Sequence, residues 1–432
     1  MSKPDFQIDE TDGPALTRAW VLHPDIKTNN DRRDPVPALA EAVALAEALP
    51  GLEVVGADVV PLRSVNAGHL LGSGKIEEIR KILHDEEVEL VLIDGPVTPV
   101  QQRNLEKVWN VKLLDRTGLI LEIFSDRAAT REGVLQVEMA ALNYQRTRLV
   151  RAWTHLERQR GGLGFVGGPG ETQIEADRRA IDEQLVRLRR QLEKVVKTRA
   201  LHRAARAKVP YPIVALVGYT NAGKSTLFNR LTGADVMAKD MLFATLDPTM
   251  RSLELLDGPE IILSDTVGFI SDLPTELVAA FRATLEEVLA ADIVLHVRDI
   301  SHAETNEQAR DVRDILTSLG VPEDTRTFEV WNKLDLVEQE KADALRERAA
   351  RDDSVMAISA ISGEGLENLQ TVVAEALQGA LRTADLVLGF ADGRKRAWLF
   401  ERDVVTDETQ TEDGFELTVR WSAEVEAAYL RL

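Results

Sequence analysis

Apolar runs alternate with amphipathic stretches along the chain up to Asp115. The runs at 16–22, 52–60, 88–93 and 111–114 are rich in aliphatic and β-branched residues and predict strands. The stretches at 36–49, 74–84 and 99–108 have the apolar spacing of helices. This alternating order predicts a small parallel-sheet α/β domain.

The apolar spacing changes after Gly133, where two long stretches each carry a helical stripe. The stripes consist of Leu135, Met139, Leu142, Leu149, Trp153 and Leu156, and then of Ile174, Ile181, Leu185, Leu188, Leu192 and Val195. Two such helices can bury both stripes as a long antiparallel hairpin. Residues 161–170 between them include six glycines, and four arginines flank them: Arg158, Arg160, Arg178 and Arg179.

The glycine-rich segment 161–170 and the charge of its surroundings indicate binding. A tight connection between helices needs only about two to five residues, so we expect a binding tip. The alternative is a loop whose glycines only reverse the chain. The formal net charge is −20, but residues 144–208 hold 16 Lys+Arg against 7 Asp+Glu. Such a basic segment indicates a directed electrostatic contact, and the alternative is a solvated arginine-rich helix face.

Residues 218–225 fit the pattern G-x-x-x-x-G-K-[ST] without a mismatch. An apolar run at 211–217 precedes them and a helical stretch at 225–231 follows, as in a phosphate-binding loop. Backbone N–H groups can surround the phosphates, Lys224 adds a positive charge, and the Ser225 hydroxyl can reach Mg²⁺. The residues expected to contact the nucleotide are Gly218, Tyr219, Thr220, Asn221, Ala222, Gly223, Lys224, Ser225 and Thr226.

Further motifs follow in the order that guanine-nucleotide switches need. They consist of Asp265, Thr266, Val267 and Gly268, then of Asn332, Lys333, Leu334 and Asp335, and last of Ser359 and Ala360. Asp265 can hold Mg²⁺ through water, and the Gly268 N–H can contact the γ-phosphate. The Asp335 carboxylate can accept two hydrogen bonds from guanine, whereas adenine offers no such pair on that edge. Ser359 and Ala360 are expected to close over the guanine O6 with a backbone N–H.

A segment without strong periodicity lies between the first two motifs and is expected to be a mobile switch loop. It consists of Phe243, Ala244, Thr245, Leu246 and Asp247. Thr245 is the candidate for a hydroxyl that ligates Mg²⁺ only in the GTP state, and Thr249 is the alternative. The expected catalytic residues are Lys224, Gly268 and Thr245, and the expected metal ligands are Ser225 and Thr245.

Length and composition bound the rest. With 432 residues and 44% apolar content, the chain can form two to four domains. We expect a disordered N-terminus (1–14), an α/β domain (15–130), the hairpin (131–208), a Ras-like P-loop GTPase domain (209–382) and an α+β extension (383–432). The absence of cysteine and the scattered histidines leave Mg²⁺ as the expected metal. No stretch is typical of a membrane span or signal peptide, so we expect a cytoplasmic protein without a membrane partner. We also expect a monomer without a DNA partner.

Together these motifs resemble an HflX-type GTPase, a branch of the translation-factor-related P-loop GTPases. The resemblance rests on GYTNAGKS (218–225), FATLD (243–247), DTVGF (265–269), NKLD (332–335), GSGKIEEI (72–79) and GGLGFVGGPGETQIEADRR (161–179). It implies a GTPase that binds the large ribosomal subunit and its RNA. It further implies that the hairpin reaches toward the peptidyl transferase centre and that the protein splits ribosomes under stress. Residues 383–432 are the part that the resemblance covers least.

Single positions refine this interpretation. Phe269 stands where Ras-like enzymes have the glutamine that orients water, so we expect slow intrinsic hydrolysis that a partner stimulates. Asn221 resembles an asparagine with which related GTPases hold potassium.

Residues 72–75 imitate a phosphate-binding loop, but Ile76 has no hydroxyl for a metal, so we expect a helix-capping turn rather than a second nucleotide site. The alternative function is a protein-directed switch whose hairpin is a docking coiled coil without RNA affinity.

Overall fold

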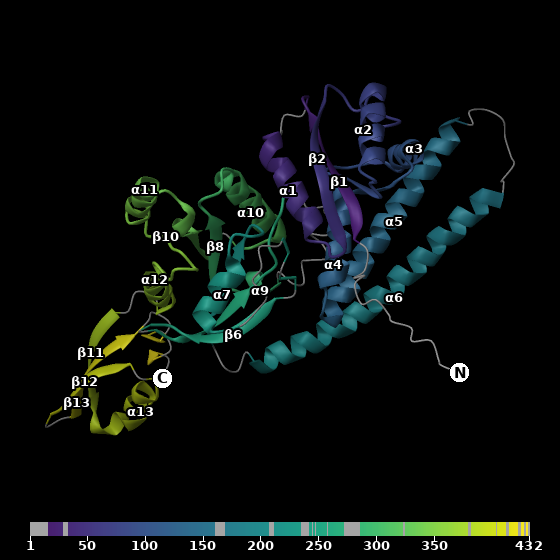
Figure 1. Cartoon of the computed structure of the whole chain (residues 1–432). Helices are drawn as coiled ribbons and strands as arrows, with labels where there is room; N and C mark the ends of the chain where they lie inside the picture. The colour runs from purple at the N-terminus through teal and green to yellow at the C-terminus, as the bar shows by residue number, and fades with distance from the viewer. Residues whose placement is uncertain are drawn as a thin grey trace, which may run out of the picture.

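The computed structural model describes most of the chain, and Figure 1 shows the arrangement of its elements. The described residues are 16–28, 33–159, 169–206, 211–234, 242, 243, 245, 246, 248–256, 258–271, 286–322, 325–378, 382–402, 404–411, 414–421, 425, 426, 429 and 430. The N-terminal segment 1–14 and residues 161–168 of the glycine-rich tip, for which we made predictions, lie outside them.

A four-stranded sheet with the order β2-β1-β3-β4 forms the N-terminal domain, and every neighbouring pair of its strands is parallel. The strands are β1 (Thr17–Ile26), β2 (Leu52–Leu62), β3 (Leu90–Ile93) and β4 (Lys112–Asp115), and the helices are α1 (Pro35–Glu47), α2 (Ser73–Asp85), α3 (Pro99–Trp109) and α4 (Arg116–Arg127). The expected boundaries agree with these to within four residues, but the sequence analysis did not include α4.

Both faces of this sheet are buried, as is usual for parallel sheets. Successive side chains of a strand point to opposite faces, so Leu22, Val91 and Ile93 pack with α2 and α3, whereas Val21 and Leu92 pack with α1 and α4. Figure 1 shows α1 on the side of the sheet that faces the nucleotide domain, with α2 and α3 on the opposite side. The α1/α4 face therefore supplies the contact between the two domains.

Two long helices, α5 (Arg131–Gln159) and α6 (Pro169–Arg206), pack along each other beside this domain (Figure 1). Their shared core consists of Leu135, Leu142, Leu185 and Leu188, with Met139, Ile181, Leu192 and Val195 packed around it. All of these belong to the two apolar stripes, so the regular spacing of large aliphatic residues provides the surface on which the helices pair.

A six-stranded sheet forms the nucleotide domain, in the order β10-β9-β8-β5-β7-β6, with only β6 antiparallel to its neighbour. Its strands are β5 (Ile213–Gly218), β6 (Thr249–Glu254), β7 (Glu260–Asp265), β8 (Ile293–Asp299), β9 (Arg326–Asn332) and β10 (Val355–Ala357). Its helices are α7 (Lys224–Thr232), α9 (Glu286–Leu289), α10 (Thr305–Leu319), the short η1 (Leu334–Leu336), α11 (Gln339–Ala349) and α12 (Leu366–Gln378). After β5, the chain adds β6 and β7 on one side of that strand and then β8, β9 and β10 on its other side. The strand order therefore reverses at β5, and ligands of such sheets bind beyond the carboxyl ends of the strands at this point.

The C-terminal segment has a small antiparallel sheet with the order β11-β13-β12. Its elements are β11 (Arg382–Gly389), η2 (Phe390–Asp392), α13 (Gly393–Glu401), β12 (Val405–Gln410) and β13 (Gly414–Trp421). Leu388, Leu399, Leu417 and Val419 form a separate apolar core there. Among the described residues, no helix combines the length and apolar character needed to cross a membrane.

Candidate nucleotide site

The glycines of the phosphate-binding loop are required because neighbouring groups approach the backbone closely. β5 ends at Gly218, where φ is +152° and a Cβ atom would lie 2.1 Å from the carbonyl oxygen of Val297. Gly223 directly precedes α7, has a φ of +91°, and would place a Cβ 2.3 Å from Nδ2 of Asn332. A side chain at either position would displace these neighbours, so the loop geometry requires glycine.

Lys224 is the first residue of α7, and its ammonium group is buried against the loop. It donates hydrogen bonds to the backbone carbonyls of Gly218 (3.2 Å) and Tyr219 (2.8 Å). Burial lowers the pKa of Lys224 to about 8, and the negative charge of Asp265 opposes this effect only in part. A buried ammonium at a helix N-terminus attracts anions, so this corner of the domain suits phosphate.

Three side-chain oxygens meet beside the loop. The Ser225 hydroxyl donates to Oδ2 of Asp265 at 2.7 Å and lies 2.8 Å from the Thr245 hydroxyl, which also donates to Oδ2 at 3.0 Å. Oδ1 of Asp265 is buried and has no hydrogen-bond partner in the described part of the chain. Burial raises the pKa of Asp265, although Lys224 and the two hydroxyls act in the opposite direction. This set of hard oxygen donors fits Mg²⁺.

Of the two threonines considered for the metal, Thr245 belongs to this cluster. Thr249 is the first residue of β6, where it pairs with Asp265 across the ladder. Phe243 and Leu246, on either side of Thr245, are buried in the apolar core. The other two residues expected in the switch loop, Ala244 and Asp247, lie outside the described residues.

The residues expected to bind the base lie at the carboxyl ends of β9 and β10, next to the loop. The Asn332 side chain donates to the carbonyl of Ala222 at 2.9 Å and accepts from the backbone N–H of Ala360 at 3.0 Å. The Ser359 hydroxyl donates to Oδ1 of Asp335 at 2.5 Å. Asn332 therefore ties the phosphate-binding loop to the segment that presents Asp335, and the three motifs meet at one edge of the sheet.

Gly268 and Phe269 follow β7 and pack directly against the loop. A Cβ at Gly268 would lie 2.8 Å from Cα of Thr220 and 3.0 Å from Nζ of Lys224. The Phe269 backbone donates to the carbonyl of Gly218 at 3.1 Å and accepts from the Thr220 N–H at 2.7 Å. Its ring is buried in the apolar core with Tyr219. Phe269 is thus a packing residue in this arrangement.

Comparison with known proteins assigns the chain to one family. Four family models match in succession: GTP-binding GTPase N-terminal (37–125), GTP-binding GTPase Middle Region (127–206), 50S ribosome-binding GTPase (213–333) and HflX C-terminal domain (344–431). GTPase HflX of Magnetococcus marinus is 48% identical over 386 residues, which cover 89% of this chain and 88% of that protein. The chain belongs to the HflX family. GTPase HflX of Escherichia coli is 44% identical over 80% of each chain.

This membership confirms the expected family and shows that the chain is a GTP-binding, GTP-hydrolysing enzyme. The HflX C-terminal model continues to residue 431, so it also matches the segment that the motif resemblance covered least. Outside the nucleotide domain, the GSGK segment begins a helix: Gly72 is the N-cap residue of α2, and Lys75 pairs with Glu78 at 2.8 Å.

A polar network joins the N-terminal domain of this HflX GTPase to its nucleotide domain. Glu41 of α1 accepts hydrogen bonds from Arg116 (2.6 Å), from the Ser271 hydroxyl (2.6 Å) and from the Tyr219 hydroxyl (2.5 Å), and Arg33 lies 3.4 Å away. The Ser271 N–H donates to the Tyr219 hydroxyl at 2.6 Å. Burial alone would raise the pKa of Glu41, but the positive charges of Arg116 and Arg33 outweigh it and lower the pKa.

Local sequence pattern did not predict this network, although the sequence contains one sign of a buried polar contact. Glu41 lies three residues after Ala38 and four before Leu45, both of which are buried core residues of α1. A carboxylate on the apolar face of a helix calls for buried cationic partners. The sequence does not identify them, because Arg116 and Ser271 are 75 and 230 residues away.

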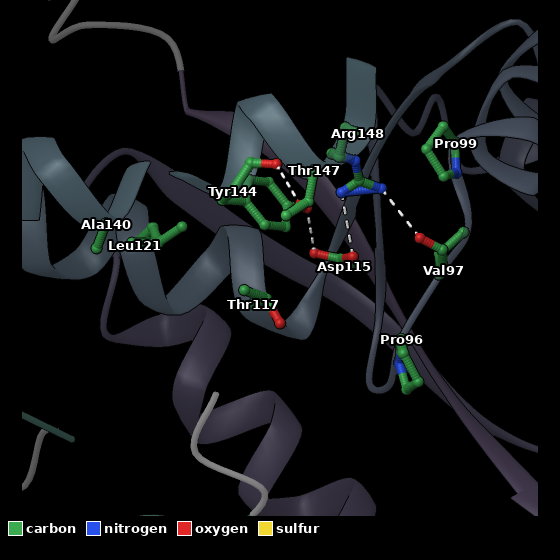
Figure 2. Close-up of a pocket in the computed structure, with 10 residues that line it drawn as sticks. All are labelled: Pro96, Val97, Pro99, Asp115, Thr117, Leu121, Ala140, Tyr144, Thr147 and Arg148. Carbon is green, nitrogen blue, oxygen red and sulfur yellow. Dashed lines mark hydrogen bonds and ion pairs between the residues drawn. The ribbon is translucent and has the colours of Figure 1, made fainter. Parts of the chain in front are cut away.

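A second cluster lies where the hairpin meets the N-terminal sheet, around the small cavity of about 140 Å³ in Figure 2. Asp115, the N-cap residue of α4, accepts from the Tyr144 hydroxyl at 2.6 Å and from Arg148 at 3.1 Å. Arg148 also donates to the carbonyl of Val97 at 3.2 Å. Burial raises the pKa of Asp115, against the charge of Arg148. Because both Asp115 oxygens already have partners, we interpret the cluster as a brace that fixes α5 to the sheet.

Proposed function

We propose that this HflX-family GTPase binds the large ribosomal subunit through the α5–α6 hairpin and splits or rescues ribosomes under stress, with the bound nucleotide controlling how long it stays. The observation that carries the proposal is a basic hairpin attached to a GTP-hydrolysing domain. Residues 144–208 have a net charge of +9 within a chain of −20. The family model over 213–333, described as 50S ribosome-binding GTPase, supports the same partner.

The described half of the hairpin presents its positive charge to solvent. Five arginines of α6 are exposed: Arg178, Arg179, Arg187, Arg189 and Arg190. Arg179 pairs with Glu175 at 3.5 Å, but both side chains are more than two-thirds exposed (76% and 68%), and such pairs are weak. Arg179 can therefore exchange Glu175 for an RNA phosphate at little cost, and the other exposed guanidinium groups can also reach phosphates.

At the nucleotide site, we propose that Lys224 and the loop N–H groups bind the phosphates and that Ser225, Thr245 and Asp265 hold Mg²⁺, Asp265 through water. Mg²⁺, when bound, neutralises the charge that develops on the phosphate oxygens. Gly268 provides a backbone N–H close to Lys224, where the γ-phosphate would lie. Asp335 selects guanine through the N1–H and the 2-amino group.

Hydrolysis by the isolated protein should be slow. Phe269 is buried and offers no polar atom to orient water, so we propose that the ribosome completes the site. A catalytic group supplied in trans can raise GTPase rates by about 10³ to 10⁵. We further propose that exposed Asn221, with a left-handed φ of +58°, helps to hold K⁺ beside the phosphates. Equal hydrolysis rates in KCl and NaCl would contradict the potassium site.

The test is co-sedimentation with 50S subunits, with GDP or a non-hydrolysable GTP analogue, over a range of salt concentrations. The Arg178→Gln/Arg179→Gln variant should bind more weakly. Its log–log salt slope should fall by about 0.7 to 0.9 for each RNA phosphate that the variant no longer neutralises. The matched control is Arg310→Gln/Arg351→Gln, which removes two exposed arginines of the nucleotide domain.

A second variant, with residues 161–170 replaced by a short Gly-Ser turn, tests the tip. It should bind GTP and keep the basal rate, yet lose ribosome-stimulated hydrolysis and splitting. Full ribosome stimulation and splitting by this variant would refute the proposed role of the tip, and equal salt slopes for the wild type and both arginine variants would place the RNA contact elsewhere on the chain.

A further inference from the structure

Phe243, two residues before Thr245, is held in an unusual conformation. Its φ is +57°, in the left-handed region that residues with a Cβ rarely adopt. Only 2% of its surface is exposed. A strained backbone persists only where surrounding contacts compensate for it, so the position of this ring must be fixed by its neighbours.

An aromatic neighbour of this ring belongs to the other domain. The ring of Phe124, on α4 of the N-terminal domain, lies edge-on to the ring of Phe243, with centroids 4.6 Å apart and an angle of 81° between the planes. Phe124 is fully buried. Leu242 and Leu246 enter the same core, which also includes Val137 of α5. The switch segment is thus anchored to the N-terminal domain through Phe243, and Leu242 and Leu246 are buried in the core that both domains share.

The ring contact of Phe243 lies only two residues along the chain from Thr245, which belongs to the candidate metal site. Two residues of chain span at most about 7 Å, so Thr245 cannot stay on Ser225 and Asp265 if Phe243 moves far. The Thr245 hydroxyl bonds to both residues while Phe243 is docked on Phe124. The contact of Phe243 with Phe124 and the contacts of Thr245 with Ser225 and Asp265 therefore form together.

We propose that Phe124 is a positioning residue for GTP hydrolysis: its contact with Phe243 holds Thr245 at the metal site, so the N-terminal domain sets the Mg²⁺ requirement of the GTP-bound state. This inference rests on the proposed role of Thr245 as a ligand that binds Mg²⁺ only with GTP. It makes Mg²⁺ affinity depend on a residue that touches neither metal nor nucleotide.

The experiment is a Mg²⁺ titration of the full chain with a fluorescent non-hydrolysable GTP analogue and, separately, with fluorescent GDP. Phe124→Leu keeps an apolar side chain but cannot form the edge-on ring pair. Aromatic pairs of this kind change equilibria by about 2- to 12-fold, so the Mg²⁺ midpoint with the analogue should rise by that factor. With GDP the midpoint should not change. An equal shift with both nucleotides, or none with the analogue, overturns the proposal.

Further variants separate this role from general stability and from the role of Thr245. Leu105→Ala, in the core on the other face of the same sheet, should leave both midpoints unchanged. Phe243→Leu removes the other ring of the pair and should shift the Mg²⁺ midpoints as Phe124→Leu does. It replaces Phe124→Leu in the experiment if that variant does not fold. In a Thr245→Ala background, Phe124→Leu should add nothing. If Thr245→Ala itself leaves the analogue midpoint unchanged, the proposed metal role is wrong, whereas a shift there without one in Phe124→Leu overturns only the present inference.

Discussion

Replacing Glu41 by alanine should destabilise the whole protein, because this carboxylate is the shared acceptor of the network between the domains. Its side chain is only 10% exposed, and that of Arg116 only 7%, with 2.6 Å between the bonded atoms. Removing one partner of a buried ion pair typically costs about 3 to 5 kcal/mol, since the other charge stays buried. Arg116 keeps its ion pair with Asp94 at 2.5 Å, so we expect about 3 kcal/mol, at the lower end.

Urea unfolding followed by tryptophan fluorescence measures this destabilisation as a lower midpoint. The control is Glu78→Ala, which removes an exposed carboxylate paired with Lys75 at 2.8 Å and should change stability by about 1 kcal/mol or less. A double-mutant cycle of Glu41→Ala with Tyr219→Phe should show coupling of about 0.5 to 3 kcal/mol, because the two side chains share a hydrogen bond across the domain boundary. Equal midpoints for Glu41→Ala and Glu78→Ala would refute this reasoning.

Further predictions concern the nucleotide site and acid stability. Lys224→Ala should weaken both GDP and GTP in equilibrium binding, because it removes the cation at the phosphates, and unchanged affinity would contradict that assignment. Asp335→Asn should weaken guanine nucleotides by about 1.5 to 3 kcal/mol for each charge-assisted hydrogen bond that it removes, which calorimetry can measure. Gly223→Ala should abolish nucleotide binding, since its Cβ would lie 2.3 Å from Nδ2 of Asn332. The lowered pKa of Glu41 stabilises the fold above pH 4.5, its ordinary pKa, and this stability is lost as the pH falls through the lowered value. Acid titrations should therefore show a shallower loss of stability for Glu41→Gln.

The sequence predicted those parts of the fold that local pattern controls. The parallel strands, the paired helices and the phosphate-binding loop all follow from spacing and glycine positions. Helix α4 did not, because its run Leu119 to Phe124 is apolar on nearly all sides and has no period to detect. That composition has a cause: α4 is covered by the sheet, by α5 and by the nucleotide domain at once.

The contacts between domains could not be predicted from local pattern. Phe124 and Phe243 are both ordinary apolar residues in the sequence, and only the folded chain brings them together. The same holds for Tyr219, whose position in the loop predicts a backbone contact with phosphate. Its side-chain hydroxyl bonds to Glu41 of the other domain, and the loop motif gives no indication of this contact. Pairings over such sequence distances depend on how whole domains pack.

The brace of Asp115, Tyr144 and Arg148 is a point about which α5 can tilt relative to the N-terminal sheet. It holds α5 near its middle, and that helix has 29 residues, or roughly 44 Å at about 1.5 Å per residue. About 11 residues separate Arg148 from Gln159, which corresponds to roughly 16 Å of helix beyond the brace. A tilt of about 10° at the brace would therefore swing the end of α5 by roughly 3 Å. A change of angle at the brace therefore moves the end of α5 by a distance that grows with the length of helix beyond Arg148.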